Sequence, residues 1–393
     1  MQRNFLKYKF TFLLLLVTFI SFANNKKLSQ DAVISILTCD EGEEIYSLFG
    51  HIALRVKDKH KDEIYNWGMF EFSENQTEFG YNFAKGRLKY YMAIQKFDYF
   101  IYEYSYFNRG VREQILNLSY PQKQELYNEL QINYLPENRA YKYDFFYDNC
   151  SSRIRDLLNK ILTNKIVIHT HKDADKFTFR QVIDSRLKIV PWLNLGIDLV
   201  LGKKIDIIVS NKDLMFLPSY FEQILDSSYI KINEGLENLV ISKSILIPSS
   251  KVDNKETKNI SKYFWILLGI TLLLYILKLK YITSFYFNTL LFSVGILGVL
   301  LFFMWFYTDH NATKANYNLL WANPLHLITF ISIFSKKLIK KLRTYYLFMT
   351  IIMLVIVLLW IILPQELPTV IRPIILTLTI IYYYLFCLSK RNY

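Results

Sequence analysis

The chain has 393 residues, of which 52% are hydrophobic, and it carries a formal net charge of +13. Much of that charge lies in short segments between long apolar runs, so it indicates membrane topology and not nucleic-acid binding. None of the 12 glycines has the spacing of a phosphate-binding loop, and no cysteine, histidine or carboxylate cluster has metal-ligand spacing. The sequence therefore predicts no cofactor and no metal.

The N-terminal segment, residues 1–23, has the form of a secretory signal. Basic residues precede the almost wholly apolar run 10–19, and the small residue Ala23 comes just before the polar stretch 24–27. Such a segment directs export and is then either removed or kept as an anchor. We therefore expect residues 1–23 to be a signal peptide or N-terminal anchor, and the next domain to lie outside the cytoplasm.

The exported part begins with a pattern typical of β-structure. Apolar and polar residues alternate at 52–56 and 63–68, which predicts a hairpin whose turn is the charged segment 57–62. A helix is predicted from Tyr120 to Asn133, because Pro121 suits an early helical position and leucines recur every four residues. These patterns indicate a domain of mixed α and β structure.

A further helix is predicted after the polar sequence DNCSS at 148–152. Asp148 or Asn149 is suited to be its N-cap, which places Cys150 in the first turn. The free N–H groups and the dipole at a helix N-terminus stabilise a thiolate, so Cys150 is a candidate nucleophile. Its base would be a histidine, and His51, at the start of the first predicted strand, is the best placed.

Spacing alone does not decide the role of Cys150. Cys39 is also in the exported part, and an oxidising compartment permits a disulfide between the two. The other exported histidines, His60, His169 and His171, lie in polar turns and connections, where we expect them to be structural or solvated.

We divide the exported part into a thiol-bearing core at 24–165 and a C-terminal part at 166–260. Residues 263–388 are predicted to form an all-α membrane bundle. Lys and Arg accumulate on the cytoplasmic side of membranes, so the basic loops predict an outward loop at 308–323 and a cytoplasmic C-terminus. We expect about five spans, at 263–277, 285–307, 324–334, 345–363 and 370–388.

Several sequence motifs together resemble the Lnb N-terminal periplasmic domain family. In the first half these are FGHIALRV at 49–56, YNWGMF at 65–70, NRAYKY at 138–143 and YDNCSSRIRD at 147–156. The resemblance continues through PWLNLGID at 191–198, MFLP at 215–218 and DHNATKANYNLLWANP at 309–324. It therefore covers nearly the whole mature chain.

The resemblance implies an α+β fold of the permuted papain-like kind, as in NlpC and lecithin–retinol acyltransferase, with a histidine on an early strand and a cysteine on a later helix. It implies a multi-pass protein of the bacterial inner membrane that acts as a lipoprotein N-acyltransferase. The implied partners are a phospholipid acyl donor, a diacylglyceryl lipoprotein as acceptor, and the bilayer.

The site expected from the resemblance is a catalytic pair, Cys150 and His51, with backbone N–H groups at the helix start holding an oxyanion. Asn66, on the neighbouring strand, is predicted to orient the histidine. The residues predicted to bind substrate are Arg153 and, in the outward loop, His310, Asn316, Asn318, Trp321 and Asn323. For the loop residues the equally open alternative is that they form a capped turn between two spans.

Two other functions remain open from the sequence. The first keeps the catalytic pair but acts on a peptidoglycan amide, as NlpC-like enzymes do, although several membrane spans are hard to explain for that reaction. The second is a non-enzymatic envelope scaffold in which Cys150 is structural or bridged to Cys39.

Overall fold

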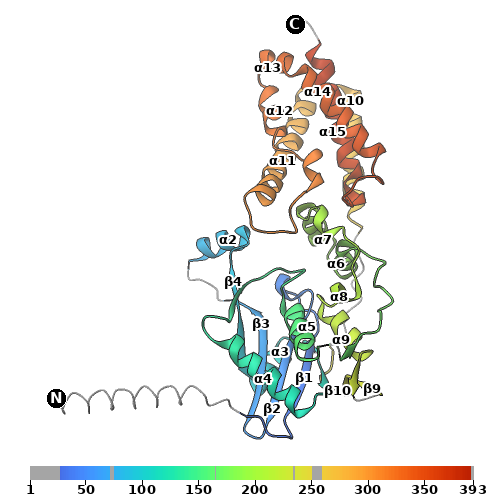
Figure 1. Ribbon diagram of the computed structural model, residues 1–393. Helices are drawn as coiled ribbons and strands as arrows, with labels where there is room; N and C mark the ends of the chain where they lie inside the picture. The colour runs from blue at the N-terminus through green and yellow to red at the C-terminus, as the bar shows by residue number, and fades with distance from the viewer. Residues whose placement is uncertain (1–26, 71–74, 164, 233–234, 250–258, 391–393) are drawn as a thin grey trace, which may run out of the picture.

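The sheet-rich first half and the helical second half form separate parts of the molecule (Figure 1). The expected order of a sheet-rich domain followed by a helical region is therefore confirmed, whereas the predicted signal at 1–23 lies outside the described residues. The computed structural model describes residues 27–70, 75–163, 165–232, 235–249 and 259–390.

Seven strands form one antiparallel sheet in the order β10-β5-β1-β2-β3-β4-β6. The predicted hairpin is confirmed as β2 and β3, which pair up to Asp58 and Lys61 and so have a tighter turn than expected. The strands are β1 (Val33–Cys39), β2 (His51–Asp58), β3 (Lys61–Met69), β4 (Lys89–Lys96), β5 (Val111–Leu116), β6 (Ala140–Lys142) and β10 (Val240–Ile247).

The central strands β1 and β2 of the sheet are buried on both faces. Three helices cover it: α3 (Phe97–Tyr106), α4 (Tyr120–Tyr134) and α5 (Cys150–Ile161). Ile36 of β1 belongs to the core cluster shared with α4 and α5, whereas the next residue, Leu37, packs with Phe100 of α3. Successive residues of a strand point to opposite faces, which is why β1 is an almost continuous apolar run.

The helix predicted at 120–133 is confirmed as α4. Ser119 is its N-cap, in a capping box with Gln122, and Pro121 lies in its first turn. Further along, the aromatic segment 141–146 is extended only as far as Lys142 in β6. The remainder turns back through paired backbone bonds between Asp144 and Asp148.

Smaller elements complete the first half. A three-stranded sheet has the order β7-β8-β9. The elements are η1 (Ile45–Ser47), α2 (Gln76–Lys85), β7 (Ile166–Val167), α6 (Phe179–Leu187), α7 (Pro191–Val200), η2 (Lys203–Ile205), α8 (Asn211–Leu214), α9 (Pro218–Asp226), β8 (Tyr229–Ile232) and β9 (Gly235–Asn238).

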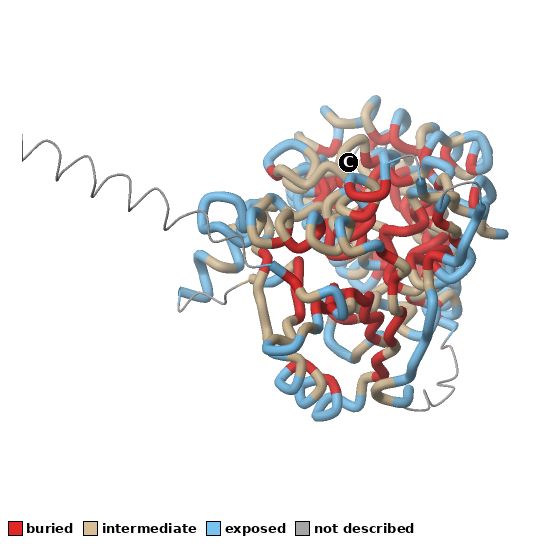
Figure 2. The backbone as a smooth tube through the Cα atoms, turned by 60° about the horizontal axis from the view of Figure 1, so that its bottom comes forward, coloured by how far each residue is buried: buried red, intermediate tan, exposed pale blue. Residues whose placement is uncertain are grey.

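The helical half packs around its own apolar core, and buried residues concentrate inside both halves (Figure 2). Its helices are α10 (Ser261–Leu277), α11 (Lys280–Phe306), η3 (Tyr317–Leu320), α12 (His326–Ser332), α13 (Lys336–Lys341), α14 (Arg343–Leu358), η4 (Thr369–Ile371) and α15 (Arg372–Ser389).

Two helical stretches among the described residues, Lys280–Phe306 and Thr369–Ser389, are long and apolar enough to span a membrane. The helices α10 and α14 are apolar but shorter. The segment expected at 324–334 contains only the seven-residue α12, whose rise of about 10 Å is a third of a bilayer core. A total of five spans thus stays a prediction, and so does the papain-like assignment.

Candidate active site

Cys150 is the first residue of α5, as predicted, and Asn149 is the N-cap. The Asn149 side chain accepts a hydrogen bond from the Ser152 N–H at 2.9 Å. Its amide nitrogen donates to the carbonyls of Phe145 at 2.7 Å and Phe216 at 2.9 Å. Asn149 is thus held from three sides, so the first turn of α5 and its cysteine have a fixed position.

His51, the first residue of β2, contacts Cys150. The preceding Gly50 has a φ of +77°, and a Cβ there would lie 2.7 Å from the Cys39 carbonyl oxygen, so this close approach of β1 and β2 requires glycine. The His51 ring hydrogen-bonds to the Cys150 thiol, and the Ile52 backbone N–H donates to the same sulfur. The early strand and the later helix therefore meet at these two side chains.

The electrostatics of the pair favour an ion pair. Burial acts to raise the pKa of Cys150, but the charge of His51 and the hydrogen bonds to the sulfur outweigh it, so that the pKa lies below its usual value. Burial acts to lower the pKa of His51, and the Cys150 thiolate outweighs it, raising the pKa. A thiolate beside an imidazolium is the reactive form of a nucleophilic cysteine.

A chain of hydrogen bonds runs from His51 to the protein surface. The His51 Nε2 lies 3.1 Å from Asn66 Oδ1, on β3. Asn66 Nδ2 donates to Gln95 Oε1, on β4, at 3.4 Å. Gln95 Nε2 in turn donates to a carboxylate oxygen of Glu103, on α3, at 3.1 Å. The sequence indicated Asn66 as the orienting residue, and the structure places it against the ring of His51.

The Glu103 carboxylate, at the end of this series of hydrogen bonds, determines which group donates and which accepts in each of them. Glu103 only accepts, so Gln95 presents its NH₂ group to Glu103 and its oxygen to Asn66. Asn66 must then present its oxygen to His51, which requires a proton on Nε2. The other ring nitrogen, Nδ1, is thereby left for the Cys150 sulfur. Sequence reasoning missed Gln95 and Glu103, which no motif distinguishes from other polar surface residues.

Cys39 lies beside this site but differs in chemistry. It pairs with His51 in the register of β1 and β2, and both Cys39 and Cys150 are free thiols. Burial is the largest influence on Cys39 and raises its pKa to about 12. Cys39 is therefore a neutral buried thiol, and the structure lacks the Cys39–Cys150 disulfide that the sequence left open.

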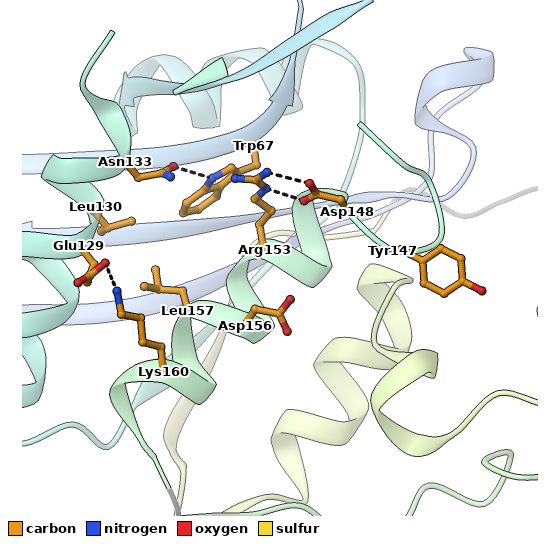
Figure 3. Close-up of a pocket in the computed structure, with 10 residues that line it drawn as sticks. All are labelled: Trp67, Glu129, Leu130, Asn133, Tyr147, Asp148, Arg153, Asp156, Leu157 and Lys160. Atoms are coloured by element: carbon orange, nitrogen blue, oxygen red, sulfur yellow. Dashed lines mark hydrogen bonds and ion pairs between the residues drawn. The ribbon is translucent and has the colours of Figure 1, made fainter. Parts of the chain in front are cut away.

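Arg153 lies on α5 one turn after Cys150. It makes a bidentate ion pair with Asp148, at 2.6 and 2.8 Å, and its guanidinium lies 3.8 Å from the centre of the Tyr141 ring. It also lines a cavity of about 520 Å³ between α4 and α5, which is shown in Figure 3. The cavity is lined by Trp67, Glu129, Leu130, Asn133, Tyr147, Asp148, Arg153, Asp156, Leu157 and Lys160.

The loop at 308–323 binds the first half of the molecule. Buried Asn316 donates to the carbonyls of Leu199 and Val200 at 2.8 and 3.0 Å. Buried Asn318 donates to the Leu199 carbonyl at 3.1 Å and accepts from Trp321 Nε1 at 2.9 Å. The last carbonyls of a helix lack intrahelical partners, so these asparagines cap the C-terminus of α7.

The other two residues predicted in this loop also have partners within the chain. His310 Nε2 is 3.1 Å from the Phe83 carbonyl oxygen of α2. Asn323 accepts from the Leu325 N–H at 3.1 Å, just before α12. The polar atoms of the loop are thus engaged in internal hydrogen bonds, as in the capped-turn alternative, and their contact with a substrate stays a prediction.

Replacing Asn318 with alanine is expected to lower the free energy of unfolding by about 1–3 kcal/mol, because the buried Trp321 N–H and α7 carbonyls lose their partner. Thermal unfolding in detergent micelles measures this. A matched control is Asn311→Ala, because the Asn311 side chain accepts its hydrogen bond from the exposed side chain of Lys204. Equal shifts for both variants would contradict the capping role.

Comparison with protein-family models identifies both halves of the chain. The family model described as the Lnb N-terminal periplasmic domain matches residues 21–185. The model described as the Lnb transmembrane domain matches residues 257–392. No curated protein and no solved structure matches the chain. The two matches are in the expected order and together cover most of the sequence.

Proposed function

The chain belongs to the Lnb family, as a membrane protein with a periplasmic domain, and from this premise we propose that it is a lipoprotein N-acyltransferase. It transfers an acyl chain from a phospholipid, through a thioester on Cys150, to the N-terminal amine of a diacylglyceryl lipoprotein. The observation that carries this proposal is the hydrogen-bonded pair of Cys150 and His51 at the start of α5. No cofactor takes part in the reaction.

In the first step the Cys150 thiolate attacks an ester carbonyl of the phospholipid. The bond from that carbonyl carbon to the glycerol oxygen breaks, and the His51 imidazolium donates its proton to the departing oxygen. The products are a lysophospholipid and an acyl thioester on Cys150. The proposed donors to the oxyanion are the backbone N–H groups of Cys150 and Ser151, because those of Ser152 and Arg153 donate to Asn149.

In the second step the α-amino group of the diacylglyceryl cysteine attacks the thioester. The carbon–sulfur bond breaks as the amide bond forms, and neutral His51 takes a proton from the amine. This restores the thiolate–imidazolium pair and releases the triacylated lipoprotein. Asn66 keeps the His51 ring in place in both steps, because its oxygen holds Nε2.

Substrate contact is proposed for Arg153, whose guanidinium lies beside the first turn of α5 and faces the cavity of Figure 3. A guanidinium suits a phosphate or carboxylate group. The proposed setting is the bacterial inner membrane, with about five spans, a cytoplasmic C-terminus and a cleavable or anchoring segment at 1–23.

Trapping the thioester tests this proposal. Purified protein in phospholipid vesicles, without acceptor, is expected to accumulate an acyl group on the peptide containing Cys150, which neutral hydroxylamine should remove. Tandem mass spectrometry identifies the modified residue. Acylation at another residue, or none with an otherwise folded protein, would exclude Cys150 as the acyl carrier.

The chain of hydrogen bonds behind His51 yields a separate prediction. Asn66→Ala is expected to lower kcat by about 100-fold, because a misplaced ring no longer reaches both sulfur and leaving group. Gln95→Leu should cause a smaller loss, and both should shift the pH profile of Cys150 alkylation, which a purely structural defect would not do. The control Gln223→Leu removes a comparable hydrogen bond, to His171, and should leave kcat and the pH profile of alkylation unchanged. Identical behaviour of the Gln95 and Gln223 variants would contradict the role of Gln95 in positioning His51.

A further inference from the structure

Helix α2 is unusual because none of its ten residues is buried. It connects β3 to β4, the strands that carry Asn66 and Gln95, yet it lies away from the sheet (Figure 1). Tyr81 is 55% exposed and Phe83 is 56% exposed. A helix this short is not stable alone in water, and large aromatic side chains are rarely left in solvent without a partner surface.

The C-terminal end of α2 is attached to the end of α11. Lys85 Nζ donates to the Tyr307 carbonyl at 2.6 Å, and the Asp309 N–H donates to the Lys85 carbonyl at 2.9 Å. The next contact is between the His310 ring and the Phe83 carbonyl, at 3.1 Å. The position of α2 along the membrane normal therefore follows that of the end of α11.

The end of α11 has the composition typical of a membrane interface. This helix is one of the two described stretches that can span a bilayer, and it ends in a run of aromatic residues that includes Phe303, Trp305 and Phe306. Aromatic residues concentrate where a spanning helix leaves the hydrocarbon. Lys85 Nζ lies 5.3 Å from the centre of the Phe303 ring, so α2 lies level with this aromatic end of α11.

A row of aromatic rings leads from α2 back to the thiol. Phe79 of α2 lies 6.0 Å from Phe70, and Phe70 lies 5.4 Å from Tyr90, between ring centroids. Tyr90 stacks on Tyr143 at 4.4 Å. The Tyr143 ring lies 6.4 Å from the Tyr141 ring, between centroids, and Tyr141 packs against the core cluster that contains Cys150. The row therefore ends at the core around the thiol.

We propose that α2 lies in the outer leaflet, with Tyr81 and Phe83 among the lipids, and that the aromatic row guides the donor acyl chain from the leaflet to Cys150. The second part rests on the proposed function. The occupant of the α2 surface is phospholipid, because the surface is continuous with the aromatic end of a spanning helix. Acyl chains need an apolar path out of the leaflet, and aromatic faces provide one.

Photocrosslinking tests the lipid contact without reference to activity. Benzoylphenylalanine in place of Phe83 is expected to crosslink to phospholipid in vesicles of phosphatidylethanolamine and phosphatidylglycerol. The same group in place of Tyr102, which is 70% exposed on α3, should not. Crosslinking of position 83 to a protein, or equal lipid crosslinking at both positions, would overturn the assignment of α2 to the leaflet.

Two reactions test the acyl path. The double variant Tyr81→Asp, Phe83→Asp is expected to reduce N-acylation of a lipopeptide from vesicle phospholipid by about tenfold or more, since aspartate is disfavoured among lipids. Its acylation by a water-soluble p-nitrophenyl ester should stay within about twofold of wild type. The control Tyr99→Asp, Tyr102→Asp changes residues that are 65% and 70% exposed on α3 and should leave both reactions unaffected.

The outcomes separate the two proposals. If the α2 variant keeps full activity with phospholipid, or loses both reactions equally, the guiding role of α2 is overturned while acyl transfer stands. If position 83 crosslinks to lipid but the wild type acylates neither Cys150 nor lipopeptide, the proposed function and the acyl path fail together and only the lipid contact stands.

Discussion

Replacing Cys150 with alanine is expected to abolish acyl transfer, with a loss in kcat of about 10⁴-fold or more, the scale found when a covalent nucleophile is removed. No acyl thioester can form without the sulfur, and a second thiol cannot substitute for it. Cys39 is close but has a pKa raised to about 12 by burial, so it is almost entirely protonated at neutral pH. The rate of lipopeptide N-acylation in vesicles measures the loss.

The matched control is Cys39→Ala. It removes the neighbouring thiol and should leave kcat within about threefold of wild type, because a neutral buried cysteine contributes packing and not nucleophilicity. Activity that survives in Cys150→Ala but is lost in Cys39→Ala would reverse the assignment of the two cysteines.

Replacing His51 with alanine is expected to lower kcat by about 10²- to 10⁴-fold, the usual contribution of a general acid–base residue. The thiol should change as well. In the wild type the charge of His51 holds the pKa of Cys150 below its usual value despite burial. Without His51, burial is unopposed by that charge, so the pKa rises and the thiolate appears only at higher pH.

The rate of Cys150 alkylation by iodoacetamide, measured against pH, reports this shift. As the pH is lowered from 9, the alkylation rate of the wild type should stay high. The rate of His51→Ala should fall at a higher pH, because the pKa of its Cys150 is higher. His60→Ala, in the exposed turn between β2 and β3, is the control and should keep the wild-type profile. Superimposable profiles for wild type and His51→Ala would show that no thiolate–imidazolium pair exists.

Local patterns predicted the parts of the site that depend on neighbours in sequence. Alternation identified the β2–β3 hairpin. The polar residues before α5 predicted Asp148 or Asn149 as the N-cap and Cys150 in the first turn, and the structure has Asn149 as the cap and Cys150 as the first residue. A strand period and a helix cap are set within a few residues. The position of His51 at the start of β2 could be inferred for the same reason.

Other features depend on long-range contacts and could not be predicted. Gln95 and Glu103 are polar residues on separate elements, and only the pairing of β3 with β4 and the packing of α3 bring them behind Asn66. The asparagines of the outward loop indicated a polar site, but in the structure Asn316 and Asn318 contact α7, more than a hundred residues earlier in the chain.

The membrane half shows how hydropathy and structure differ. Apolar runs predicted where the helices lie, and α11 and α15 were located to within a few residues. Helix length is a separate property, because the apolar run between Pro324 and Ser335 forms only the short α12. The number of spans therefore depends on helix length as well as on composition.

The most direct test of the proposed function is complementation of a strain depleted of lipoprotein N-acylation. Wild type, Cys150→Ala and His51→Ala are expressed to equal levels, and lipoprotein N-termini are read by mass spectrometry. We expect triacylated N-termini with wild type and only diacylated N-termini with both variants. Unchanged N-termini with well-expressed wild type, or triacylation that persists in Cys150→Ala, would contradict acyl transfer through the Cys150 thioester.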